Sequence, residues 1–169
     1  KESFQTVLAE LRAKARAQGL WLPFIPKEYG GMGLGPLANA LVQMELGESH
    51  LGALSMNSQG PDDATMLTLL AHGTEFQKEK YLKPLCDGYK RSCFAMTEPE
   101  VAGSDPTLIQ TRAYPDGDEW VINGHKWFIS NARRAKFAIL ICRTEDDPDL
   151  PQAANTAFIV ETHWEGWNR

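Results

Sequence analysis

The stretch that decides the fold is residues 94–105, with the sequence FAMTEPEVAGSD. Its apolar start predicts a strand, and the Thr-Glu-Pro and Gly-Ser-Asp triplets that follow predict turns. A second stretch, residues 120–130, has the sequence WVINGHKWFIS and predicts a hairpin with its turn at Asn123-Gly124. Both stretches follow Ser92, where the spacing of apolar residues changes from helical to strand-like.

The residues before Ser92 predict helices. Apolar residues recur at helical spacing from Phe4 and stop near Gly19, a plausible helix end. Pro36 fits the first turn of a second helix, and a third apolar pattern ends near Gly73. Residues 74–77, TEFQ, form a capping box that opens a fourth helix.

Six strands are predicted after this change in spacing, with a further hairpin turn at Asp116-Gly117. They cover residues 93–96, 107–114, 119–123, 126–130, 137–143 and 155–160. Residues 146–151 predict a polar loop. Because helices and strands are segregated, the predicted fold is a multidomain α+β chain. An all-α domain over residues 1–91 precedes an antiparallel, barrel-like β domain over residues 92–169.

Composition excludes several functions. The net charge is −5 and no basic run occurs, so we expect no nucleic-acid partner. No apolar run is long enough for a membrane span. The four histidines are scattered, so we expect no metal site. Cys86, Cys93 and Cys142 lack metal or redox spacing and are expected to be reduced, structural thiols. The glycines of residues 31–36 lack the dinucleotide-loop pattern and indicate a turn.

Spacing alone offers one candidate ligand site. Thr97 and Ser104 bring hydroxyls and turn amides that suit an anion such as a pyrophosphate. If residues 126–130 form a strand, Trp127 and Phe128 face opposite sides, and Ser130 shares the face of Phe128. Such a face could hold a flat ring. A turn followed by core aromatic residues is the more common explanation of the same pattern.

These stretches resemble the two flavin-binding motifs of the acyl-CoA dehydrogenase family. The residues that match the first motif are Phe94, Met96, Thr97 and Ser104, and those that match the second are Phe128, Ile129 and Ser130. Upstream, residues 26–34 and 73–78 resemble two further family segments in the same order. The resemblance covers nearly the whole chain.

Two departures from the family pattern stand out. The loop of residues 98–104 is one residue longer than the commonest form and resembles the subgroup of family members ten and eleven. Phe128 stands where most members have tryptophan. The phenylalanine keeps an aromatic face but lacks the indole N–H donor.

The resemblance implies an FAD-dependent oxidoreductase of fatty acid metabolism and β-oxidation that desaturates an acyl-CoA thioester at the α,β bond, with hydride passing to flavin N5. The family has a third, helical domain that carries the catalytic base. We therefore expect this chain to be incomplete, with a truncated β domain, to be inactive alone, and to leave the base beyond Arg169. No catalytic residue is assigned within it.

The resemblance also implies roles for individual residues. Those expected to bind FAD are Phe94, Met96, Thr97, Gly103, Ser104, Phe128, Ile129 and Ser130. Thr97 would bond an edge of the flavin ring, Phe128 would pack on the ring, and Ser130 would lie near N5. Ser104 would lie near the pyrophosphate or the CoA arm of the substrate. Leu41, Met44, Met56 and Leu69 fit a helical core, and the resemblance implies that their region also walls the acyl tail.

The implied partners are an acyl-CoA substrate, an electron-transfer flavoprotein as acceptor, and further copies of the chain in a dimer or tetramer. No targeting segment is visible, which leaves a bacterial cytoplasm, a mitochondrion or a peroxisome. Two alternatives stay open. One is an acyl-CoA oxidase or flavin monooxygenase on the same scaffold, and the other is a non-catalytic fragment that serves as an interaction module.

Overall fold

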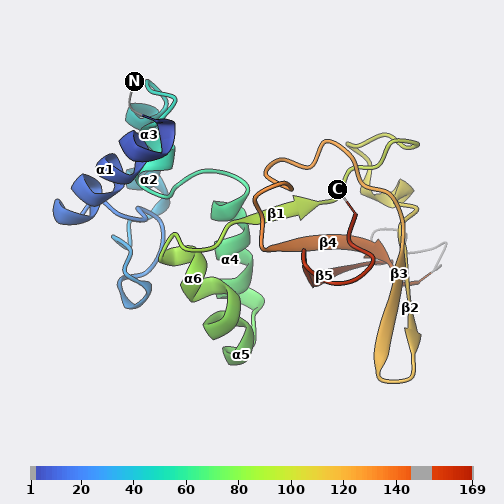
Figure 1. The fold of residues 1–169 in the computed structure, drawn as a ribbon. Coiled ribbons are helices and arrows are strands. Elements are labelled where there is room, and N and C mark those ends of the chain that lie inside the picture. The colour runs from blue at the N-terminus through green and yellow to red at the C-terminus, as the bar shows by residue number, and fades with distance from the viewer. Residues whose placement is uncertain (1–2, 146–153, 169) are drawn as a thin grey trace. The chain divides into compact units, whose positions relative to one another are not determined.

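The computed structural model describes residues 3–145 and 154–168. The chain divides into two compact units, residues 1–90 and residues 91–169. Helices make up the first unit and a sheet the second (Figure 1), which confirms the predicted order of a helical domain followed by a β domain. The polar loop predicted for residues 146–151 lies outside the described residues.

The helical unit contains all four predicted helices. Its elements are α1 (Phe4–Ala17), the 3₁₀ turn η1 (Lys27–Tyr29), α2 (Pro36–Leu46), α3 (Gly52–Ser55), α4 (Asp62–His72), α5 (Glu75–Gln77), the π-helical turn η2 (Lys78–Leu82) and α6 (Lys83–Cys86). The capping box forms as predicted, because the Thr74 hydroxyl accepts from the Gln77 amide and the Gln77 side chain accepts from the Thr74 amide. The last three elements make one continuous helical run.

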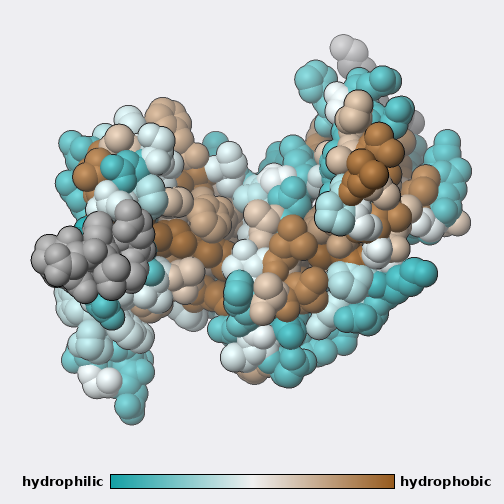
Figure 2. All heavy atoms as spheres, turned by 180° about the vertical axis from the view of Figure 1, so that it is seen from behind, coloured by the Kyte–Doolittle hydropathy of each residue, from teal (hydrophilic) through white to brown (hydrophobic). Residues whose placement is uncertain are grey.

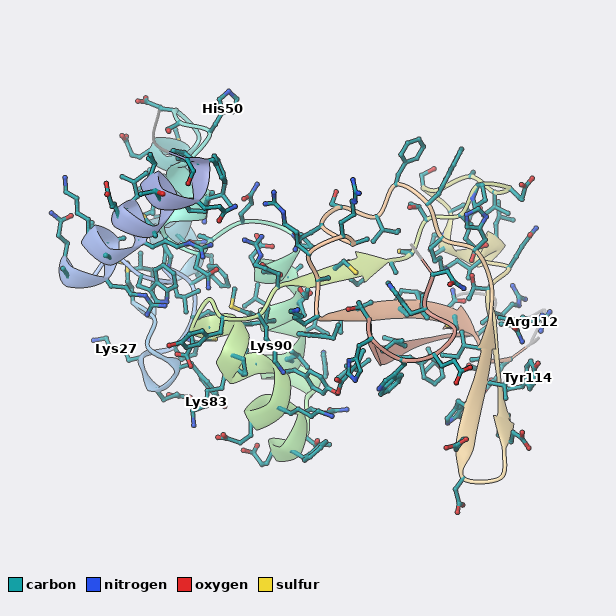
Figure 3. All side chains as sticks on the ribbon, in the orientation of Figure 1. Lys27, His50, Lys83, Lys90, Arg112 and Tyr114 are labelled. Atoms are coloured by element: carbon teal, nitrogen blue, oxygen red, sulfur yellow. The ribbon has the colours of Figure 1, made fainter. Side chains whose placement is uncertain are left out.

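The π-helical turn has a local cause in Pro84. Proline has no N–H, so it cannot donate to the carbonyl of Lys80 one turn earlier. The Lys80 carbonyl instead accepts from Lys90 Nζ at 3.3 Å. Lys90 is labelled in Figure 3 beside this run. The widened turn and the lysine let the helix continue past the proline.

The apolar residues of the helical unit divide into two groups. Met56 and Leu69 are buried, as a core prediction requires. Leu37, Leu41 and Met44 are 78%, 58% and 71% exposed, so the core prediction is wrong for the last two. They follow at helical spacing on α2, which has no buried residue. Hydrophobic residues reach the surface of this unit in the view of Figure 2.

The second unit is a mixed, open sheet. Its strands are β1 (Ser92–Ala95), β2 (Arg112–Asp116), β3 (Glu119–Asn123), β4 (Phe137–Arg143) and β5 (Asn155–Glu161), with a 3₁₀ turn η3 (Pro106–Leu108) before β2. The β2–β3 and β4–β5 pairs are antiparallel, as predicted. The β1–β4 pair is parallel, and β2 meets β4 in parallel at one residue pair. A long connection separates β1 from β4. These two strands can therefore pair in parallel, whereas a short hairpin turn would require antiparallel pairing.

One predicted strand does not form. Residues 126–130 are irregular, and Asn123-Gly124 is not a hairpin turn. Phe128 has a φ of 53° and Asn131 a φ of 69°, and neither value fits a strand. The strand predicted from residue 107 starts only at Arg112, because η3 occupies its first residues.

Small apolar residues form the core of the second unit. The buried cluster contains Cys93, Ala95, Ala113, Ala135, Ala138, Leu140 and Cys142. All three cysteines are free and buried. Burial raises the pKa of the Cys86 thiol to about 12 and that of Cys142 to about 11, so neither is a reactive thiolate.

The residues that the structure describes contain neither a metal cluster nor a membrane-spanning helix. Among them no group of three or more His, Cys, Asp or Glu side chains could hold a metal ion. Their helices are all too short or too polar to cross a bilayer.

Candidate functional site

The two stretches singled out in the sequence lie side by side. Trp127 N–H donates to the Thr97 carbonyl at 3.0 Å, and Thr97 Oγ1 donates to the Trp127 carbonyl at 2.7 Å. At the other end, Asn131 Nδ2 donates to the Ser92 carbonyl at 2.8 Å. Most of the candidate site residues therefore lie on two short segments that are tied together at both ends.

The second tied segment presents an aromatic ring to solvent. Phe128 is 84% exposed and its ring centroid lies 4.5 Å from that of Trp127. Ile129 packs against the core of the sheet, while Ser130 is exposed. The predicted strand is absent, and Trp127 and Phe128 do not face opposite sides because their rings are in contact. Phe128 and Ser130 are nevertheless both exposed, as the pattern predicted. The anchored Ile129 and the left-handed backbone of Phe128 determine instead which side chains face outward.

The first tied segment contributes less exposed side chains. Phe94 is 38% exposed and lies between buried Cys93 and Ala95 on β1. Met96 and Thr97 are half-buried. Because the Thr97 hydroxyl proton is directed at the Trp127 carbonyl, its oxygen is available to a ligand mainly as an acceptor.

The loop after Thr97 folds back toward it. A Cβ added to Gly103 would lie 3.0 Å from Thr97 Cγ2, so glycine permits this close approach. Gly103 and Ser104 are exposed. Asp105 then accepts from the Thr107 amide and hydroxyl at 3.0 and 2.6 Å, which lowers the pKa of its carboxyl. The structure thus brings the Gly-Ser turn beside Thr97.

Sequence reasoning missed a buried ion pair at this site. Lys126 Nζ lies 2.7 Å from Glu98 Oε1, and their side chains are 9% and 4% exposed. Glu98 also accepts from the Gln110 amide at 2.7 Å, the Thr111 amide at 2.9 Å and the Thr111 hydroxyl at 2.5 Å. The available signal was an acidic residue, Glu98, just after an apolar strand and a basic residue, Lys126, next to two aromatic residues.

The environment of Glu98 makes it a strong acid. Burial by itself raises the pKa of the carboxyl, but hydrogen bonds from Lys126, Thr111 and the Gln110 amide outweigh burial. They lower the pKa of Glu98 from 4.5 to about 2. Glu98 is therefore ionised at neutral pH and forms a charged pair with Lys126.

We expect the second unit to lose stability as the pH falls from about 4.5 to about 2. The pKa of Glu98 is depressed in the folded state, so its contribution is complete above the unfolded value and is lost on the way to the folded one. Urea unfolding followed by tryptophan fluorescence should show this loss in the parent and less of it in Glu98→Gln. Glu119→Gln, at an exposed position, is the control. Equal acid sensitivity of Glu98→Gln and the parent would contradict the assignment.

A groove of about 880 Å³ lies in the same unit. Apolar residues of the strands line it, including Ala95, Ile122, Leu140 and Val160. Its lining also includes Trp127, Phe128 and Ile129, but none of Phe94, Met96, Thr97, Gly103, Ser104 or Ser130. The groove is therefore lined by Ala95 of the first tied segment and by three residues of the second, but by few of the residues that the sequence singled out. Figure 3 marks Arg112 and Tyr114 on β2, neither of which lines the groove.

Two protein-family models together match most of the chain. The model of the acyl-CoA dehydrogenase N-terminal domain matches residues 1–89, and the model of the acyl-CoA dehydrogenase middle domain matches residues 93–168. The chain belongs to the acyl-CoA dehydrogenase family.

Curated relatives agree with the predicted subgroup. Acyl-CoA dehydrogenase family member 11 of Gallus gallus is 41% identical over 156 residues, which are 91% of this chain and 20% of the relative. Acyl-CoA dehydrogenase family member 10 of Mus musculus is 37% identical, over 91% of this chain and 15% of the relative. The chain spans well under half the length of these relatives.

Solved structures show the same fold. A Mycobacterium abscessus protein assigned to the acyl-CoA dehydrogenases matches with a TM-score of 0.88 and 37% identity, over 94% of this chain and 39% of the other. A glutaryl-CoA dehydrogenase from Mycobacterium smegmatis, solved with FADH2, matches with a TM-score of 0.71 and 29% identity, over 93% and 38%.

Proposed function

We propose that the protein carrying this chain is an FAD-dependent acyl-CoA dehydrogenase. The main support is that the two segments resembling the family's flavin motifs are tied together by hydrogen bonds between Thr97 and Trp127. The relative solved with FADH2 supports the choice of cofactor. The proposed reaction is oxidation of an acyl-CoA thioester to its α,β-unsaturated product.

The exposed side chains suit a flat, anionic cofactor. Phe128 offers an uncovered aromatic face, and the exposed Gly103-Ser104 turn offers backbone amides and a hydroxyl. We assign the ring to Phe94, Met96, Thr97, Phe128, Ile129 and Ser130, and the phosphates to Gly103 and Ser104. Bound FAD would supply the hydride acceptor that the chain's own side chains lack.

The residues of this chain bind and orient in this proposal. The Thr97 oxygen accepts a hydrogen bond from the ring edge, since its own proton is held by the Trp127 carbonyl. Phe128 covers one ring face and excludes water from it. Ser104 contacts a phosphate or the CoA arm. We assign no base to the chain, which spans only 39% of the Mycobacterium abscessus protein.

The proposed partners follow from the reaction. Electrons leaving the reduced cofactor need an acceptor, and we propose an electron-transfer flavoprotein. We further propose a homodimer or homotetramer. Mammalian and mycobacterial relatives leave the compartment open between a bacterial cytoplasm and a eukaryotic organelle.

The test of this proposal is an FAD titration of the protein with Thr97 or Ser130 replaced. The parent should be yellow and be reduced anaerobically by an acyl-CoA. Ser130→Ala removes one neutral hydrogen bond to the flavin, and Thr97→Ala removes one to the flavin and one to the Trp127 carbonyl. The loss of the flavin bond should lower FAD affinity about tenfold or less in each variant. Ser130→Ala should also change the reduction rate, whereas Ser130→Thr keeps the hydroxyl and should behave like the parent. A colourless parent, or alanine variants identical to it, would contradict the proposal.

Enlarging Met44 should change acyl-chain preference. Met44 is 71% exposed, so Met44→Trp can be accommodated without disturbing the helical core. We expect kcat/KM to fall about tenfold for the longest acyl-CoA thioesters and little for short ones, with FAD content unchanged. Met56→Trp is the matched control, because Met56 is buried and overpacking should lower folding and all activities together. Equal losses at every chain length in Met44→Trp would exclude a role in the acyl site.

A further inference from the structure

We propose that the buried ion pair of Glu98 and Lys126 is a positioning device that fixes the edge of the candidate flavin site, an inference that rests on the proposed function. Neither residue belongs to the set that resembles the family's flavin contacts. Their side chains are 4% and 9% exposed, and the two charged atoms lie 2.7 Å apart. The pair acts through the segments it joins.

Lys126 holds the first segment on both sides of Thr97. Its Nζ donates to the Met96 carbonyl at 2.9 Å and to Glu98 Oε1 at 2.7 Å. The next residue, Trp127, makes the two hydrogen bonds to Thr97. Residues 96, 97 and 98 are thus each fixed by Lys126 or its neighbour. A shift of Lys126 would move three consecutive residues of the proposed ring edge.

Glu98 anchors this assembly to the sheet. Its two oxygens accept from the Gln110 amide and from the Thr111 amide and hydroxyl, just before β2. A carboxylate held by four donors has one geometry available, because every movement breaks a charge-assisted hydrogen bond. The proposed ring edge is therefore positioned relative to β2 as well as to residues 126–127.

Stability alone does not explain such a pair. Desolvation offsets most of the Coulomb attraction of a buried ion pair, so an apolar or neutral pair of similar size often stabilises a fold equally well. Removal of one partner is different, because it leaves a buried charge uncompensated. A neutral double replacement therefore separates positioning from stability.

Single replacements also test the proximity of the pair to the flavin. Lys126→Met removes a positive charge beside the proposed ring edge and should lower the flavin reduction potential. Glu98→Gln removes a negative charge and should raise it. A residue that only supported the fold would not produce shifts of opposite sign.

The experiment uses the FAD-loaded protein carrying this chain, with the double variant Glu98→Gln/Lys126→Met. We expect it to unfold close to the temperature of the parent and to bind FAD about tenfold more weakly. Amide exchange at Trp127 should rise about tenfold, on the energy scale of one charged hydrogen bond, while exchange at Leu140 in β4 is unchanged.

The exposed pair of Glu79 and Lys83 is the control, with side chains 71% and 60% exposed. Lys83 is labelled in Figure 3, and neutralising this pair should change none of the readouts. A folded double variant with parental FAD affinity and parental Trp127 exchange would overturn the proposal. If the double variant does not fold, the test uses Thr111→Val, which removes the hydroxyl that donates to Glu98. Faster amide exchange at Trp127 in this variant supports the proposal, and unchanged exchange overturns it. A parent that binds no FAD contradicts the proposed function, while amide exchange at Trp127 still tests whether the Glu98–Lys126 pair holds the two segments.

Discussion

Replacing Phe128 with glycine should remove most of the bound FAD while leaving the fold intact. The Phe128 side chain is 84% exposed, so its loss opens no core cavity. Its φ of 53° costs a residue with a Cβ about 1–2 kcal/mol, which glycine avoids. Glycine loses more backbone entropy on folding, so the unfolding free energy of the apo protein should stay within about 1 kcal/mol of the parent.

The expected loss of FAD follows from the missing ring. Covering an aromatic side chain contributes about 1.5–3 kcal/mol and stacking about 0.5–1.5 kcal/mol more, so FAD affinity should fall about a hundredfold. The measurements are the flavin-to-protein absorbance ratio and the melting temperature of the apo protein. Phe128→Trp, which introduces the residue most family members have, is the matched control and should retain FAD. Parental FAD binding by Phe128→Gly would show that the ring site has been assigned wrongly.

A strained, exposed aromatic residue is expected at a functional position and not in a core. The strain at Phe128 is maintained because Trp127 is tied to Thr97 and Asn131 to Ser92. Such outliers persist only where surrounding contacts determine them, and they gather at ligand sites. The backbone strain and exposure of Phe128 therefore support a functional role that the sequence pattern alone did not indicate.

Sequence predicted the helical unit well because its signals are local. Pro36 begins α2, and the Thr74 capping box begins α5, since caps depend on residues within one turn. Burial was harder to predict. Leu41 has helical spacing yet lies exposed, because spacing indicates a shared face and not which partner covers that face.

The sheet and the site depended on contacts between distant residues. Residues 126–130 have strand composition, but hydrogen bonds to Thr97 and Met96 hold them in an irregular path. The pairing of Glu98 with Lys126 spans nearly thirty residues, and no local rule predicts it. The resemblance to a known family named candidate site residues, whereas only the structure showed what holds their two segments together.

Gly124→Ala should be among the most damaging single substitutions in the second unit. A Cβ at this position would lie 2.2 Å from Thr111 Oγ1 and 2.5 Å from Thr111 Cβ, so one backbone segment must move. Thr111 also donates twice to Glu98, and its displacement would break those bonds. We expect the unfolding free energy to fall by about 3 kcal/mol, measured by urea unfolding with tryptophan fluorescence.

Gly117→Ala separates this close approach from a simple glycine effect. Gly117 has a φ of 61° in the β2–β3 turn and nothing within 4 Å of an added Cβ, so only backbone strain of about 1 kcal/mol is expected. The larger loss in Gly124→Ala should also weaken FAD binding, because Thr111 supports Glu98 and through it the Thr97 segment. If Gly124→Ala lowers the unfolding free energy no more than Gly117→Ala does, the contact between residues 111 and 124 is looser than the structure shows, and this explanation of Gly124 is wrong.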